Sequence, residues 1–285
     1  MNLLSFLKNL TSRLSLCLCL LLPLPSWATT VQVQTSQGNF VINLFDFDAQ
    51  VKLTVDNFLA YVNANAYDDT FFHRSDPGFV LQGGGFVYGG MFPAPQDTDL
   101  GLIPVQLVAG QENTTIINQP RYSSVRGTVA MAKIGNDPDS ASNQWFINLN
   151  DNATALDLQN GGFTVFGIVE SGMDVVNAIV AYNLLSPGYP SPLDELPLQN
   201  YTNDDFTNNV VPDDTNLAII NTVTVLDSSV DTAADLDLVL NELFLGFRPT
   251  PVITQPEFKD GGNVGIVGLV LLVSLLTLRR RFQNR

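Results

Sequence analysis

The sequence is poor in the residues on which most catalytic and metal chemistry depends. It has only two cysteines, Cys17 and Cys19, and a single histidine, His73. Both cysteines lie in an N-terminal stretch that we expect to be removed, so the mature chain has no thiol for a disulfide, a thiolate metal site or a nucleophile. One histidine also gives no basis for a histidine-built metal centre. We therefore expect no metal and no cofactor.

Basic residues are scarce and unevenly placed. The chain has 13 Lys and Arg against 28 Asp and Glu, a formal net charge of −15. Six of the basic residues lie in the two end segments, which leaves seven against all 28 acidic residues between them. We therefore expect no nucleic-acid partner, because binding phosphates needs a basic surface. We interpret the acidity as solubility in a salty medium.

The N-terminus has the pattern of an export signal. A basic start with Lys8 and Arg13 precedes an apolar stretch at 14–24, and Ser26-Trp27-Ala28 then places small residues before a cleavage site. A membrane anchor is the alternative, but the apolar stretch is short for crossing a bilayer. We expect residues 1–28 to be a signal peptide. The body of the protein is then exported in a Gram-negative bacterium, to the periplasm, a membrane tether or the cell surface.

The C-terminus has three parts in order. Asp260-Gly261-Gly262 precedes an apolar run at 264–278, and Arg279-Arg280-Arg281 follows it. The apolar run is short for a stable span, and the arginines favour a cytoplasmic end. The order resembles the GlyGly-type sorting tails of Gram-negative bacteria, which a rhomboid-like protease cuts near the glycines. A permanent tail anchor is the alternative. We expect 261–285 to be the only part of the protein that meets the membrane.

Between the ends, short periodic segments predict a mainly β domain. Residues 31–34 and 40–44 alternate around a turn cluster and predict a β-hairpin. Apolar residues at helical spacing predict a helix over 51–62, and a second helix is expected over 174–182. Further strands are expected at 127–131, 145–149, 163–169 and 218–226. Many short strands with two helices favour a closed antiparallel barrel with helices at its ends.

Composition divides the chain further. We place one domain at 29–228 and interpret residues 184–217, rich in Pro, Asn and Asp, as a surface insert within it. Residues 229–260 form an acidic extension and linker. Its one apolar patch, at 236–247, is expected to form a short helix packed on the domain.

Five motifs stand in fixed order within this domain. They are Phe72-His73-Arg74; Pro77-Gly78-Phe79 with Gln82-Gly83-Gly84; the run at 126–132; the run at 142–147; and the segment at 156–167. Together they resemble the cyclophilins, a family of peptidyl-prolyl cis/trans isomerases, over about residues 30–227. The resemblance implies a mainly β fold, an eight-stranded antiparallel β-barrel capped by two helices. It also implies an enzyme acting on proline-containing polypeptides, and we expect a monomer.

The resemblance assigns the catalytic role to Arg74. A guanidinium is always charged, and its fork of donors can address the proline carbonyl and nitrogen together. Phe79, Met131, Phe146 and Leu156 match the family's proline pocket. Gln82 matches a residue that binds substrate backbone and orients the arginine, and the main chain of Ala132 matches one that pairs with the peptide. The resemblance also places two further residues at the substrate site, Gln144 and Phe163.

We expect His73 to be structural, and three other residues differ from the family pattern. Strand alternation turns His73 away if Arg74 faces the groove, so we expect a structural histidine. Ala155 stands where many members carry tryptophan, which puts cyclosporin binding in doubt. Phe163 replaces a histidine and Lys133 an asparagine. Since Arg74 remains, we expect activity. The alternative is a module that binds proline-containing segments with little or no turnover and recruits partners through its insert and tail.

Overall fold

The computed structural model describes most of the chain between the two end segments: residues 28–95, 97, 99–108, 115–184, 188–227 and 236–247. All of these belong to one structural unit that ends at Phe247. The expected signal peptide, apart from Ala28, and the expected C-terminal tail lie outside the described residues. Among the residues described, no helix is both long and apolar enough to cross a membrane.

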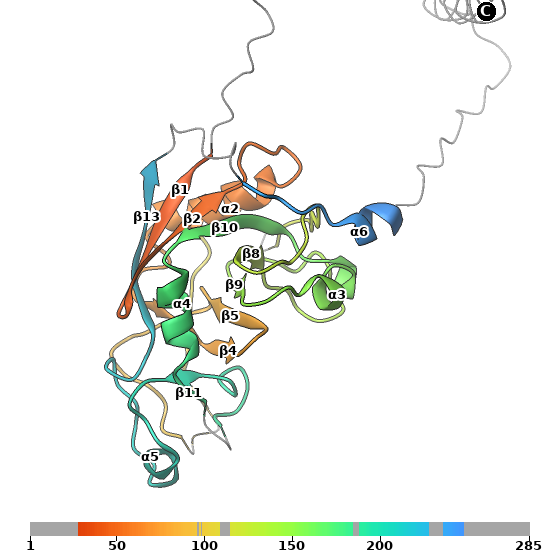
Figure 1. The fold of residues 1–285 in the computed structure, drawn as a ribbon. Coiled ribbons are helices and arrows are strands. Elements are labelled where there is room, and N and C mark those ends of the chain that lie inside the picture. Colours follow the sequence, from red (N-terminus) through yellow and green to blue (C-terminus); the bar gives the residue numbers. More distant parts are fainter. Residues whose placement is uncertain are drawn as a thin grey trace, which may run out of the picture. The chain divides into compact units, whose positions relative to one another are not determined.

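A curled antiparallel sheet is the centre of the fold (Figure 1). Strands β1 (Thr30–Thr35) and β2 (Gly38–Leu44) pair residue for residue around a tight turn, so the predicted hairpin is confirmed. Strand β13 (Ile219–Asp227) pairs with the other edge of β1. The chain therefore returns to the sheet after the insert, as the apolar run at 218–226 predicted.

The sheet continues in both directions from this group. Beyond β2 come β10 (Val165–Ser171), β8 (Thr128–Met131), β9 (Trp145–Asn148), β5 (Val80–Gly83) and β4 (Arg74–Asp76). Beyond β13 come β3 (Thr70–Phe71), β6 (Phe86–Val87) and β7 (Ile103–Pro104). The mainly β class is confirmed. The described sheet has eleven strands rather than the expected eight, because the irregular segments around the longer strands add two-residue pairings at its edge.

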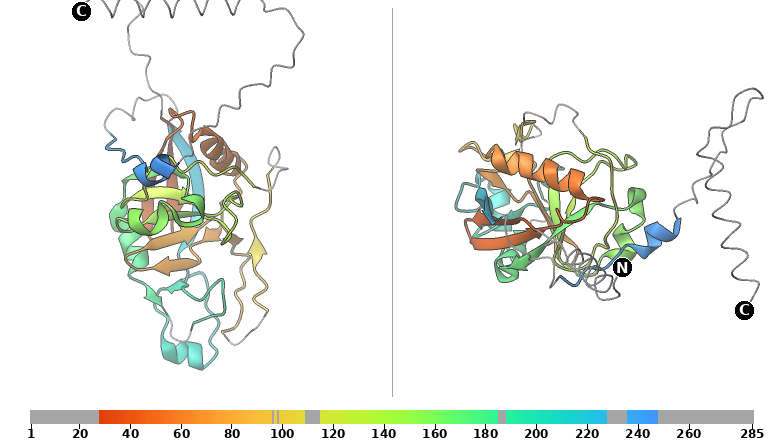
Figure 2. Two further views of the ribbon diagram at one scale, coloured as in Figure 1. Left: turned by 90° about the vertical axis from the view of Figure 1, so that its right-hand side faces the viewer. Right: turned by 90° about the horizontal axis from the view of Figure 1, so that it is seen from above.

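Both predicted helices are present and lie at different ends of the curled sheet (Figures 1 and 2). Helix α2 (Lys52–Asn63) buries Val55, Phe58 and Val62, which the 3.6-residue period places on one face. Helix α4 (Met173–Val180) follows Gly172, whose positive φ of 83° suits glycine. Three short helical turns were not predicted: α3 (Ala153–Leu156), η2 (Gln159–Gly161) and α5 (Asn203–Thr207).

Strand alternation sorts the side chains onto two faces of the sheet. On the inner face, Val129, Met131, Trp145 and Ile147 are fully buried in the main apolar core. On the outer face, Val80, Ala130, Phe146 and Val165 belong to a separate cluster that includes Leu156 of α3. Since successive residues of a strand point to opposite faces, one apolar run serves both clusters.

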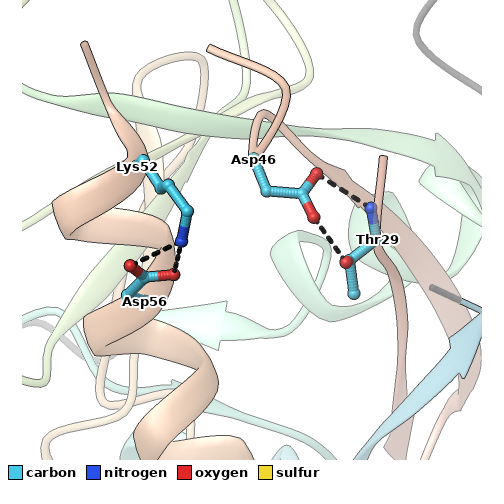
Figure 3. Close-up of polar contacts among 4 residues, drawn as sticks. All are labelled: Thr29, Asp46, Lys52 and Asp56. Atoms are coloured by element: carbon cyan, nitrogen blue, oxygen red, sulfur yellow. Dashed lines mark hydrogen bonds and ion pairs between the residues drawn. The ribbon is translucent and has the colours of Figure 1, made fainter. Parts of the chain in front are cut away.

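Two polar contacts fix the start of the described chain and the exposed side of α2 (Figure 3). The main-chain N–H of Thr29 donates to Asp46 Oδ1 at 3.0 Å, and its hydroxyl donates to Oδ2 at 2.6 Å. On α2, Lys52 Nζ lies 2.5 Å from the carboxylate of Asp56 one turn later. This second pair is half exposed, and pairs at this spacing stabilise a helix by only about 0.2–0.5 kcal/mol.

The insert at 184–217 has an apolar core of its own. Its described part contains β12 (Pro197–Leu198), which pairs with β11 (Asn183–Leu184), and α5, which begins with a capping box between Thr202 and Asp205. Its buried side chains pack against Phe71 and Phe92 of the main domain: Tyr189, Leu193, Leu196, Leu198, Tyr201, Phe206 and Leu217. The prediction of a surface excursion was therefore too simple, because proline, asparagine and aspartate outnumber the apolar residues that anchor it.

The described part of the acidic extension packs on the domain beside α3. Its expected short helix is present as α6 (Glu242–Phe247). Just before α6, the fully buried Asn241 donates from its main-chain N–H to the Arg121 carbonyl and from Nδ2 to the Asp157 carbonyl, both at 2.9 Å. Asp157 caps the end of α3, so the extension contacts the element that carries Leu156.

Candidate active site

A row of residues on the outer face of the sheet brings most of the predicted site together. In the antiparallel register, Arg74 on β4 lies opposite Gln82 on β5, and Gln82 lies opposite Phe146 on β9. Phe146 in turn lies opposite Ala130 on β8. Directly opposed residues on neighbouring strands share a face and come within contact distance. Strand pairing alone therefore aligns a cation, an amide and an aromatic ring.

Arg74 stands at the end of this row, between two carboxylates. Its Nε donates to Glu195 Oε2 at 2.5 Å, and its Nη2 lies 3.6 Å from Asp76 Oδ2. Asp76 belongs to the same strand, whereas Glu195 comes from the insert. About a third of the Arg74 side chain remains exposed, at 33%, so the guanidinium is held but accessible.

A pocket of about 270 Å³, lined by both polar and apolar residues, opens beside Arg74. Arg74, Gln82, Lys133 and Gln159 supply its polar groups. The remaining lining residues are Phe79, Val80, Ala132, Phe146, Leu156 and Phe163. The rings of Phe146 and Phe163 meet edge to face, with centroids 5.6 Å apart. A concave apolar site with a few convergent polar groups is the usual form of a small-ligand pocket, and this one suits a compact apolar ring beside a cation.

A second pocket of about 200 Å³ adjoins the first and shares Gln82, Ala132 and Lys133 with it. Gln144 lines this second pocket and accepts a hydrogen bond at its Oε1 from Gln82 Nε2, at 2.8 Å. The main-chain N–H of Ala132 donates to the Gln144 carbonyl at 2.9 Å. The two predicted glutamines therefore link the two pockets, and Gln82 borders both.

Lys133 lies at the boundary of the two pockets and holds the segment that carries Phe163. Its Nζ donates to the carbonyls of Asn160, at 2.9 Å, and Gly162. The same atom lies 4.5 Å from the centroid of the Phe163 ring, a cation–π distance. Burial lowers the pKa of Lys133 to about 8, although Asp139 and Asp137 act in the opposite direction. Lys133 is thus mostly an ammonium ion at pH 7.

Asn152 joins the two sides of the apolar pocket. Its Nδ2 donates to the Phe79 carbonyl at 2.7 Å and to Asn148 Oδ1 at 2.8 Å. Asn152 also precedes α3, which supplies Leu156. The turn carrying Phe79 and the helix carrying Leu156 are therefore tied together by one buried amide.

Met131 is the predicted site residue that lines neither pocket. It is fully buried on the inner face of β8, opposite Trp145, in the main core. Alternation along the chain puts Ala130 and Ala132 on the side of the site and Met131 on the other. The assignment of Met131 to the proline pocket is therefore corrected to a core residue. The apolar position next to Phe79 is filled instead by Val80.

His73 lies outside both pockets, as the alternation predicted. It is 2% exposed, and its ring meets Phe86 edge-on with centroids 5.1 Å apart. Burial lowers the pKa of His73 to about 4, and the charge of Arg74 adds to the effect. The imidazole is therefore neutral at pH 7 and belongs to the packing of the domain.

Two glycines after Gln82 make room beside the site. Gly84 has a φ of 76°, and a Cβ built there would come within 2.8 Å of Trp145 Nε1. A Cβ on Gly85 would lie 3.0 Å from the side chain of Gln144. The glycine run therefore permits both a left-handed turn and the close approach of Gln144.

Comparison with known proteins identifies the family. Residues 30–201 match the family model described as cyclophilin type peptidyl-prolyl cis-trans isomerase/CLD. A peptidyl-prolyl cis-trans isomerase of Streptomyces antibioticus is 42% identical over 155 residues, covering 53% of this chain and 82% of that protein. Peptidyl-prolyl cis-trans isomerase B of Escherichia coli is 39% identical over 155 residues, covering 52% and 82%. A Cryptosporidium parvum cyclophilin-type isomerase structure aligns with a TM-score of 0.43 at 21% identity, covering 70% of this chain and 98% of that one.

The chain therefore belongs to the cyclophilin-type peptidyl-prolyl cis-trans isomerase family, and the expected enzyme class is confirmed. Of the predicted site residues, Arg74 and seven others line the two adjoining pockets. The sequence did not point to Val80, Gln159 or Glu195. Val80 could have been found from alternation, since it has the parity of Gln82 on the same strand. Glu195 gave no signal, because 121 residues separate it from Arg74.

Proposed function

We propose that this cyclophilin-type isomerase accelerates rotation about Xaa-Pro bonds in proline-containing polypeptides during the folding of exported proteins. The observation that carries the activity is the placement of Arg74 at the rim of an apolar pocket that includes Phe79, Phe146 and Leu156. The pocket holds a proline ring, and the guanidinium lies where it can reach the amide of that proline.

The reaction needs no nucleophile, because no covalent bond is made or broken. An Xaa-Pro bond has partial double-bond character, and its rotation faces a barrier of about 18–20 kcal/mol. In the twisted transition state the nitrogen loses resonance and gains a lone pair. A fixed cation with N–H donors stabilises that state more than the planar ground state. A turnover of about a thousand per second requires a barrier lower by roughly 7 kcal/mol.

The chain's residues divide this task. Arg74 supplies charge and donors towards the proline nitrogen and carbonyl, while the apolar lining immobilises the ring so that rotation occurs on one side of the bond. Gln82 and the main chain of Ala132 border both pockets and can pair with the peptide backbone. Fixing one side of the bond and stabilising the twisted nitrogen both lower the barrier to rotation.

Replacement of Arg74 tests this function directly. Arg74→Ala should lower kcat/KM on a Xaa-Pro peptide by two or more decades, about 3 kcal/mol of transition-state stabilisation. Arg74→Lys should recover only part, because lysine restores the charge but not the fork of donors. Lys52→Ala removes another cation, on the exposed side of α2, and should leave turnover unchanged. The measurement is a protease-coupled or NMR-exchange assay. Equal rates for wild type and Arg74→Ala would exclude catalysis by Arg74. They would favour the alternative, a module that binds proline-containing segments without turnover.

The export context of this proposal rests on the two ends of the sequence. A basic start, an apolar stretch and the Ser26-Trp27-Ala28 site support removal of residues 1–28. The glycine pair, apolar run and arginine cluster at 261–285 support a sorting tail or an anchor. The protein would then act as a monomer in the periplasm, tethered to a membrane or at the cell surface of a Gram-negative bacterium. The intact mass of the exported protein tests both ends: a mass matching 1–285 would exclude both cuts.

A further inference from the structure

Glu195 reaches the site from a part of the chain that no motif marks. Its Oε2 accepts a hydrogen bond from Arg74 Nε at 2.5 Å, and its carbonyl accepts one from the main-chain N–H of Ser75 at 2.7 Å. Two contacts, one from the side chain and one from the main chain, therefore fix Glu195 against the strand that carries Arg74. The second makes Glu195 an extra backbone partner of β4.

The segment around Glu195 is packed firmly enough to fix the position of the Glu195 carboxylate. Leu193 and Leu196 on either side of it are 1% and 3% exposed, within the apolar cluster of the insert. Phe71 of β3 and Ile219 of β13 belong to the same cluster, so the insert is anchored to the sheet. The carboxylate is therefore placed by packing as well as by its own ion pair.

A carboxylate on the catalytic cation can act in two ways that predict opposite effects. It can weaken the field of the guanidinium, in which case its removal speeds the reaction. It can also occupy Nε and so fix the plane and direction of the fork, in which case its removal slows the reaction. Contact at Nε leaves the outer Nη nitrogens for the peptide, and Asp76 approaches Nη2 only at 3.6 Å. This geometry favours the second role.

We infer that Glu195 is a positioning residue for Arg74, and that the insert is thereby part of the catalytic apparatus. The inference rests on the proposed isomerase function, since it assigns Glu195 a role through Arg74. The pair contributes little to stability: both side chains are about a third exposed, and exposed ion pairs are worth little. Loss of Glu195 should therefore affect turnover far more than folding.

The test compares Glu195→Ala, Glu195→Gln and the charge-matched control Asp194→Ala in the full chain. Glu195→Ala should lower kcat about ten- to a hundredfold with little change in KM, since a misplaced catalytic group costs this much. Glu195→Gln keeps an oxygen acceptor for Arg74 Nε–H and should therefore retain most of the wild-type kcat. Asp194→Ala removes a neighbouring exposed charge and should leave both constants unchanged. Thermal midpoints of all three variants should match the wild type.

A second readout keeps the inference separate from the proposed function. The Nε–H proton of Arg74 should exchange slowly with water in the NMR spectrum of the wild type and rapidly in Glu195→Ala. An unchanged Nε–H signal, or a Glu195→Ala variant at least as fast as wild type, would overturn the positioning role while leaving the isomerase intact. Absence of turnover in the wild-type protein would instead exclude the proposed isomerase function. The Nε–H signal would still show whether Glu195 holds Arg74.

Discussion

His73 and Arg74 are neighbours in the sequence with opposite surroundings. Arg74 points to a groove and keeps a third of its side chain exposed, whereas His73 is almost fully buried and packs on Phe86. One strand step separates the two faces, so a change at either residue tests a different property. We expect replacement of Arg74 to affect turnover, and replacement of His73 to affect the dependence of stability on pH.

We predict that His73 makes the fold sensitive to acid. Its pKa is about 4 in the folded protein and about 6.5 when unfolded, so only the unfolded chain binds the proton between these values. The stability that depends on a neutral His73 is fully present above pH 6.5 and is lost as the pH falls towards 4. Between pH 7 and 4.5, wild type should lose about 2–3 kcal/mol more than His73→Gln.

Urea unfolding of both proteins at the two pH values measures this difference. The many carboxylates titrate in both proteins, so their contribution cancels in the comparison. Equal losses in wild type and His73→Gln would contradict a neutral buried imidazole.

Single residues also show what the sequence could predict about the site. The family motifs mark Arg74, Gln82 and Phe146 as site residues, and the strand register places the three in one row. Met131 was misplaced because a motif match ignores parity: it occupies the inner face of its strand. Glu195 could not be predicted, since its contact with Arg74 depends on how the insert folds back over 121 residues.

At the scale of elements, the described part of the acidic extension packs on the domain. The region 236–241 contributes Leu236 and Leu238 to the outer cluster that also contains Leu156 and Phe146. Asn241 then joins the extension to the end of α3. Residues that line the pocket thus pack against a segment that lies beyond residue 201, where the match to the family ends.

We predict that Asn241→Ala destabilises the protein by about 2 kcal/mol. The side chain is fully buried, and its loss would leave the Asp157 carbonyl and the Phe244 N–H without their partners. Asn63→Ala, at the exposed last residue of α2, is the matched control and should change stability by less than about 0.5 kcal/mol. Chemical unfolding at pH 7 measures both, and similar values for the two variants would show that the extension does not support the domain.

Element prediction succeeded where the periodic pattern was long. The β1–β2 hairpin, α2 and β13 each have enough alternating or helical repeats to fix their type. Two-residue strands such as β3 and β6 carry no periodic signal and exist only because a neighbouring strand offers hydrogen bonds. Helix α3 spans only four residues, and its start is fixed by the distant Phe79 carbonyl through Asn152.

At the scale of the whole molecule, the acidic excess should influence which peptides arrive. The sequence between the two end segments contains seven basic and 28 acidic residues. A strongly negative protein attracts cationic peptides over about 30 Å at about 10 mM salt, and higher salt screens this attraction. We predict that a Xaa-Pro peptide flanked by lysines has a higher kcat/KM than one flanked by glutamates at about 10 mM salt, and that the ratio shrinks several-fold at about 0.5 M.

The assay compares the two charged peptides at the two salt concentrations. A peptide with uncharged flanks is the control and should show little dependence on salt. A lysine-to-glutamate ratio that does not change with salt would mean that local contacts, and not the net charge, set the preference.

The contact between Thr29 and Asp46 gives the expected signal cleavage a physical consequence. In the uncut chain, the nitrogen of Thr29 is a neutral amide that donates to Asp46 at 3.0 Å. A cut after Ala28 would turn this same nitrogen into an ammonium group already facing a carboxylate. The new positive charge would add a direct Coulombic attraction to the hydrogen bond that the amide already donates to this carboxylate. Such a cut would thereby also tighten the chain just before the first strand, so that removal of the N-terminal segment and a gain in stability would be one event.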